Sequence, residues 1–148
     1  IGLTAERHDV NGEGPDVLWL LPNNIGFVIE AKSRKKEDNP LTKEEHGQLL
    51  VAAEWFEKHY PDYTGVRVSV HPKNHATKAA VAGASHAFTY RKLEALVADA
   101  RTLLAKLCES QLGTKDLETE CNRLLSQSDV RYDRLLSKYL EPFEEIDR

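Results

Sequence analysis

The sequence predicts an α/β protein in which helices flank a central sheet, and three observations support this fold class. Two apolar runs, 17–21 and 25–29, are separated by the turn residues of 22–24 and predict a β-hairpin. Apolar residues with helical spacing follow at 42–60. Alternating valines at 66–70 then predict another strand. A strand, a crossover helix and a further strand are typical of an α/β layer.

Length and composition limit the function classes that need to be considered. The 148 residues correspond to one domain of ordinary size. With 20 basic and 24 acidic residues the net charge is −4, so nucleic acid would have to be bound by a local patch. Cys108 and Cys121 lack zinc-type spacing and favour a reducing, cytoplasmic setting. No run approaches 18 apolar residues and no signal peptide is recognisable, so we expect a soluble protein without a membrane partner.

Local signals place the remaining elements of the first part of the chain. Thr42, followed three residues later by Glu45, is the pattern of a capping box and predicts a helix from there to about Tyr60. The valine strand would end at Pro72. The alanine-rich stretch 75–83 is ambiguous and includes a short helix among its readings, while 87–90 fits a short strand.

The last third of the chain is predicted to be helical. Leucine and alanine spacing predicts a helix over 92–112, ended by Gly113. Two further amphipathic segments, 117–125 and 130–140, would form a helical extension of the α/β core. We therefore divide the chain into 1–112 and a C-terminal extension, 113–148. One further reading is a homodimer formed through these helices. The absence of methionine leads us to expect a piece of a longer protein, whose other domains would be partners.

Two carboxylates at the ends of the hairpin strands carry the functional hypothesis. If 22–24 forms a three-residue loop, Leu21 pairs with Ile25 and Asp16 pairs with Glu30. Opposed carboxylates repel unless a cation lies between them. Mg²⁺ or Mn²⁺ suits such a site, because hard cations take a few carboxylates together with waters and phosphate oxygens. A two-residue turn would instead place Asp16 on the opposite face.

The residues after Glu30 complete the outline of a phosphodiesterase site. The carbonyl of Ala31 is a third candidate ligand, and Lys32 shares the face of Glu30 and would stabilise charge on phosphoryl oxygens. Arg34, Lys35 and Lys36 form a basic run that would contact backbone phosphates. The ordinary structural explanation is an Asp in a turn after Pro15, an exposed Glu–Lys pair and a solvated charge run.

Pro15-Asp16, thirteen intervening residues and Glu30-Ala31-Lys32 resemble the signature of the PD-(D/E)xK nuclease superfamily. The resemblance covers about residues 3–97 and implies a restriction endonuclease-like fold, a mixed central sheet flanked by helices. It implies Asp16 and Glu30 as metal ligands and Lys32 as a catalytic residue. The implied activity is that of a Mg²⁺- or Mn²⁺-dependent deoxyribonuclease. DNA or RNA as substrate, and endonuclease or exonuclease action, stay open.

The resemblance extends to the following helix, with departures. Gln48 looks like the polar residue that this helix often supplies, although the RecB-like subgroup expects Tyr where this chain has Ala52. The longer stretch of sequence from the first hairpin strand through the helix to the end of the valine strand, residues 15–72, resembles the C-terminal nuclease-type domain of bacterial DEAD/DEAH-type helicases. Members of the family carry an N-terminal helix before the first strand, often with an acidic residue, and of this region we expect the chain to contain only residues 1–5. Whether Glu6 or Glu13 assists the metal is open. The alternative function is an inactive nuclease fold used for nucleic-acid binding or protein docking.

Overall fold

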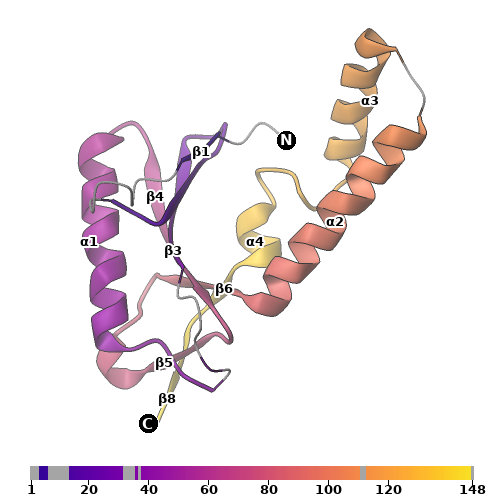
Figure 1. Cartoon of the computed structure of the whole chain (residues 1–148). Helices are drawn as coiled ribbons and strands as arrows, with labels where there is room; N and C mark the ends of the chain where they lie inside the picture. The colour runs from indigo at the N-terminus through magenta and orange to yellow at the C-terminus, as the bar shows by residue number, and fades with distance from the viewer. Residues whose placement is uncertain (1–3, 7–13, 32–35, 37, 111–112, 148) are drawn as a thin grey trace.

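The chain forms a mixed six-stranded sheet with helices on both faces (Figure 1). This architecture is taken from a computed structural model, which describes residues 4–6, 14–31, 36, 38–110 and 113–147. The strands lie in the order β1-β2-β3-β4-β6-β7, and a separate pair joins β5 to β8. The elements are β1 (Thr4–Glu6), β2 (Val17–Leu20), β3 (Ile25–Ala31), α1 (Lys43–His59), β4 (Thr64–His71), β5 (His75–Thr77), the short 3-10 helix η2 (Lys78–Ala80), β6 (His86–Thr89), α2 (Tyr90–Glu109), α3 (Thr114–Ser126), α4 (Leu135–Tyr139), β7 (Glu141–Pro142) and β8 (Glu144–Ile146). The predicted α/β class is confirmed.

The hairpin of β2 and β3 has the register that a three-residue loop requires. Val17 pairs with Ile29 and Trp19 with Phe27, and the Leu21 N–H donates to the Ile25 carbonyl at 2.9 Å. Asn24 closes the loop with φ of 56°, a left-handed conformation that Asn tolerates better than most residues. Apolar positions therefore face apolar positions along the whole hairpin, as the sequence predicted.

Helix α1 covers one face of the sheet and begins with the predicted capping box. The Thr42 hydroxyl accepts from the Glu45 N–H at 3.3 Å, and the Glu45 carboxylate accepts from the Thr42 N–H at 2.9 Å. Phe56, which is fully buried near the helix end, packs over Gly26 at the start of β3. The helix therefore runs antiparallel to β3, and its first turns lie toward the carboxyl end of that strand.

Strand β4 lies parallel to both of its neighbours, β3 and β6. The stretch left ambiguous by the sequence contains β5 and then η2, so the short helix is a single 3-10 turn. Strand β6 covers 86–89, close to the predicted 87–90. The three parallel strands thus end at the same edge of the sheet, at Ala31, His71 and Thr89.

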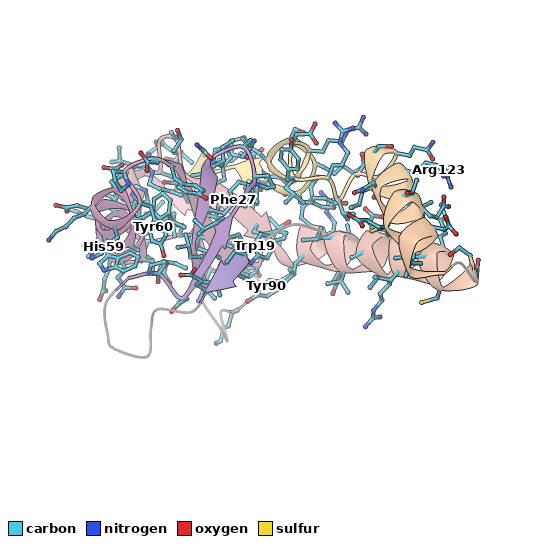
Figure 2. The ribbon with its side chains drawn as sticks, turned by 90° about the horizontal axis from the view of Figure 1, so that it is seen from above. Trp19, Phe27, His59, Tyr60, Tyr90 and Arg123 are labelled. Atoms are coloured by element: carbon cyan, nitrogen blue, oxygen red, sulfur yellow. The ribbon has the colours of Figure 1, made fainter. Side chains whose placement is uncertain are left out.

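The opposite face of the sheet carries the largest hydrophobic core. Strand residues such as Phe27 and Val68 pack there against Leu103 of α2 and Tyr139 of α4. Figure 2 shows Trp19 and Phe27 between the sheet and the base of α2, while α1 carries His59 and Tyr60 on the other side. The sheet is therefore covered on both faces, which explains why its central strands are apolar on both sides.

The C-terminal segment differs from the predicted helical extension in three respects. Helix α2 ends at Glu109, and Gly113 is instead the N-cap of α3. The predicted helix over 130–140 is reduced to the five residues of α4. Beyond it, β7 adds to the sheet beside β6, and β8 pairs with β5. The chain after α3 thus returns to the sheet, because Val130, Leu135 and Tyr139 belong to the main core.

Helices α2 and α3 form a hairpin that projects away from the sheet (Figures 1 and 2). The apolar side of α2 packs within the chain through Leu93, Leu96 and Leu103, and Val97 and Leu104 are exposed. Cys108 is exposed on this hairpin. Among the described helices, none combines the length and the apolar character that crossing a membrane requires.

Candidate metal and phosphodiester site

The two candidate carboxylates lie on the face of the sheet that α1 covers. The observed pairs end at Val17 and Ile29, and the same register extended by one residue, to the bend at Asp16, sets Asp16 opposite Glu30. Side chains at opposed positions of an antiparallel pair share a face, and this row lies two residues beyond Leu18 and Val28, which pack against α1. The register of the hairpin is therefore compatible with the predicted pairing of the two acids.

Asp16 is held against the end of β3 by a hydrogen bond. Its Oδ2 accepts from the backbone N–H of Ala31 at 2.7 Å. Hydrogen-bonded and non-hydrogen-bonded pairs alternate along the antiparallel ladder, starting from the hydrogen-bonded pair Leu21–Ile25. If this alternation continued beyond Val17–Ile29, residues 15 and 31 would form the next hydrogen-bonded pair. The carboxylate of Asp16 thus takes the place of a backbone acceptor and is fixed beside Glu30.

Pro15 leaves the Ala31 carbonyl without its partner in the hairpin ladder. A proline has no N–H to donate, so the second hydrogen bond of this pair cannot form. The Ala31 N–H points toward Asp16, and the Ala31 carbonyl is the backbone oxygen of the same residue at the end of β3. Asp16, Glu30 and this carbonyl are therefore the candidate oxygen donors at the strand end.

Glu30 is the more buried of the two acids, with 9% of its surface exposed. On its other side the parallel register pairs it with Ser69 of β4, which is 1% exposed. Sequence reasoning missed Ser69. The alternation of Val66, Val68 and Val70 places position 69 on the opposite face from the valines, but only the register between β3 and β4 reveals its neighbour.

Gln48 is an exposed residue in the first half of α1, near the end of the helix that lies toward the acid row. Ala52, one helical turn later, packs against Leu18 and Val28, and the helix runs antiparallel to β3. Gln48 is therefore displaced from Ala52 in the direction of Asp16 and Glu30. The family pattern expects a Tyr at position 52. Here the residue is Ala52, which is 4% exposed and packs directly against the sheet.

Several predicted site residues fall outside the residues that the structure describes. They are Lys32, Arg34, Lys35 and Glu13. Lys36 is described and exposed, in keeping with a solvated or phosphate-contacting position. Glu6 lies opposite Leu18 and accepts a hydrogen bond from the Tyr60 hydroxyl at 2.9 Å. This bond ties β1 to the end of α1 and directs Glu6 toward the end of the helix far from the acid row.

The donor set fits a hard divalent cation that shares its shell with a substrate. Mg²⁺ and Mn²⁺ bind through one or two carboxylates, with water and phosphate oxygens completing the shell. Asp16, Glu30 and the carbonyl of Ala31 are of this type. Within the described parts of the chain, no group of three or more His, Cys, Asp or Glu side chains could hold a metal ion. A closed all-protein cage is therefore not what these residues offer.

His46, near the start of α1, is a buried structural histidine. It is 5% exposed. Its Nδ1 donates to the Ala80 carbonyl at 2.8 Å, because a carbonyl can only accept, and its Nε2 then accepts from the Ser85 hydroxyl at 2.9 Å. Burial lowers the pKa of His46 below its usual value and also lowers that of His86. Both rings are thereby kept neutral.

Two lysines after β4, Lys73 and Lys78, form ion pairs in the structure. Lys73 Nζ lies 3.0 Å from Asp38 Oδ1, and Lys78 pairs with Asp147. His71 and His75, four residues apart in the sequence, lie on β4 and β5, so they do not form a helical metal-binding pair.

Comparison of the chain with protein-family models, with curated proteins and with solved structures finds no match.

Proposed function

We propose that this chain is a Mg²⁺- or Mn²⁺-dependent nuclease domain that hydrolyses DNA phosphodiester bonds with water as the nucleophile. The observation that carries the proposal is the Asp16–Ala31 hydrogen bond of 2.7 Å, which holds the Asp16 carboxylate on the residue that follows the buried Glu30 in β3. The finer fold assignment, a restriction endonuclease-like sheet, belongs to the same proposal. It is supported by the antiparallel β2–β3 hairpin followed by crossover helix α1 and parallel strand β4.

Each site residue has a distinct role in this proposal. Asp16, Glu30 and the Ala31 carbonyl would hold the cation, which when bound supplies Lewis-acid activation of the phosphodiester and of water. Lys32, two residues after Glu30, would offset negative charge that develops on the phosphoryl oxygens. Gln48 would orient the phosphate or the attacking water through its amide. Lys36 and its neighbours Arg34 and Lys35 would bind the DNA backbone without reading its sequence.

The burial of Glu30 gives the arrangement a chemical advantage. A carboxylate with 9% of its surface exposed interacts more strongly with a cation than an exposed one, because less water screens the interaction. Asp16 is half-buried and therefore closer to solvent. Substrate and water would accordingly approach from the Asp16 side, at the edge where the parallel strands end.

Substitution of Asp16 by Asn tests the proposal without disturbing the fold. The amide oxygen of Asn still accepts from the Ala31 N–H, whereas the charge that attracts the cation is lost. We expect Asp16→Asn to reduce Mn²⁺-dependent cleavage of single- and double-stranded DNA by at least about 100-fold. Loss of a residue that only hydrogen-bonds a metal ligand already lowers metal affinity or activity by about 10–100-fold. The melting temperature should change little.

Asp62→Asn is the matched control, because Asp62 is an exposed acid in the loop between α1 and β4, at the other end of the helix. It should cleave at the wild-type rate. Wild-type protein that leaves both substrates intact with Mg²⁺ and with Mn²⁺ would contradict the proposal. Salt-sensitive DNA binding without cation binding would then favour the inactive binding module.

A further inference from the structure

Ser69 is a buried hydroxyl that no hydrogen bond satisfies in this structure. Its side chain is 1% exposed, and its Oγ finds no partner among the residues that the structure describes. Such groups are rare in folded proteins, because a buried hydroxyl without a partner has lost its water and gained nothing in return. The position therefore needs a physical explanation.

The two cross-strand neighbours of Ser69 differ in what they offer. On one side the register pairs it with Ala87 of β6, whose methyl group cannot form a hydrogen bond. On the other side it is paired with Glu30 of β3. Paired residues of neighbouring parallel strands share a face, and adjacent strands lie about 4.8 Å apart. Of these two neighbours, Glu30 alone carries a side-chain acceptor.

An alanine would fill this position at least as well if packing were its only role. It has nearly the volume of serine and no polar atom to desolvate. The unsatisfied hydroxyl therefore lowers the stability of the cation-free folded chain. A favourable contribution from it is to be sought in another state of the protein, such as one with a bound cation. The carboxylates that bind metals are commonly held by hydrogen bonds from residues behind them, and loss of these bonds weakens metal affinity.

We propose that Ser69 is a positioning residue for Glu30, and that its hydroxyl donates a hydrogen bond to the Glu30 carboxylate when a divalent cation is bound. This inference rests on the proposed function, because it assumes that Glu30 is a metal ligand. A serine hydroxyl rotates freely about its C–O bond, so it can direct its proton without any movement of the backbone. The satisfied hydroxyl would then orient the carboxylate and contribute to cation affinity.

Ser69→Ala tests the inference, and Ser85→Ala is the matched control. Both serines are 1% exposed, but the Ser85 hydroxyl already has a partner, His46 Nε2 at 2.9 Å. Mn²⁺ affinity would be measured by the electron paramagnetic resonance signal of free Mn²⁺, and apo-protein stability by thermal unfolding. We expect Ser69→Ala to bind Mn²⁺ about 10–100-fold more weakly, with an apo melting temperature equal to or above that of the wild type. We expect Ser85→Ala to show the reverse, a lower melting temperature with unchanged Mn²⁺ affinity.

The outcomes separate this inference from the function on which it rests. If the wild type binds Mn²⁺ and Ser69→Ala binds it equally well, the positioning role is wrong and the metal site stands. If the wild type binds no Mn²⁺, both proposals are overturned. If Ser69→Ala loses affinity together with a large fall in apo melting temperature, the hydroxyl supports the fold in general and the specific role assigned to it is refuted.

Discussion

The contact between Phe56 and Gly26 sets the distance of α1 from the sheet, and Gly26→Ala tests it. A Cβ at position 26 would lie 2.2 Å from Cζ and 2.7 Å from Cε2 of Phe56, far inside any real carbon–carbon contact. The ring of Phe56 is fully buried, so it cannot move aside without disturbing the core around it. The substitution must therefore shift α1 or force Phe56 out of its preferred conformation.

The expected loss follows from two opposing terms. Overpacking of this kind costs about 1–3 kcal/mol. The smaller conformational freedom of Ala in the unfolded chain offsets about 0.4–1 kcal/mol of this. We expect a net loss of about 1–2 kcal/mol, which for a chain of this size lowers the melting temperature by about 2–8 °C.

Urea denaturation of three variants supplies the measurement and its controls. Gly47→Ala, where a Cβ meets no atom within 4 Å, should stabilise α1 by about 0.5–1 kcal/mol. Phe56→Leu removes the ring atoms that clash, so Gly26→Ala should cost at least about 1 kcal/mol less in that background than in the wild type. If Gly26→Ala is as stable as the wild type, the ring does not rest on Gly26 and the placement of α1 is wrong.

Two further predictions concern buried polar contacts away from the acid row. Burial lowers the pKa of His46 in the folded state, so the unfolded chain binds a proton more readily than the folded chain. The contribution of His46 to the free energy of unfolding should therefore be complete above about pH 6.5, the unfolded-state pKa. It should be lost as the pH falls toward the lowered folded-state pKa. Urea denaturation at pH 7.5 and at pH 5.5 should show that the free energy of unfolding falls less in His46→Asn than in the wild type. An equal fall in both proteins would contradict the lowered pKa of His46. Tyr139→Phe removes the 2.7 Å hydrogen bond from the Tyr139 hydroxyl to Asp99 Oδ2 that joins α4 to α2, and should cost about 1–2 kcal/mol in urea denaturation. No measurable change would mean that this hydrogen bond contributes nothing to holding α4 against α2.

The elements that the sequence predicted correctly are those encoded by local chemistry. The hairpin register follows from a turn of three residues, and the start of α1 from Thr42 and Glu45. Strands β1, β7 and β8 were missed because each has two or three residues and exists only through pairing with distant segments. No periodicity can be read from so short a run.

The candidate site shows the same division. Asp16 and Glu30 were found because both lie in one hairpin, within 15 residues of each other. Ser69 and the burial of His46 were missed because they depend on contacts between distant segments. His46 reaches its partners 34 and 39 residues further along the chain, and Ser69 meets Glu30 only after the crossover helix has returned the chain to the sheet.

The order Pro15-Asp16 now has a physical explanation that neither residue gives alone. A donor at position 15 would continue the ladder and occupy the Ala31 carbonyl, and an apolar residue at 16 would leave the Ala31 N–H without the acceptor observed here. Proline withholds the donor, and aspartate satisfies the N–H while it keeps a charged group beside Glu30. The pair therefore precedes β2 in a way that leaves oxygen donors available at the end of β3. A purely structural strand end would be served as well by Asn or Ser at position 16, so the charge of Asp16 is the part of this arrangement that the fold does not require.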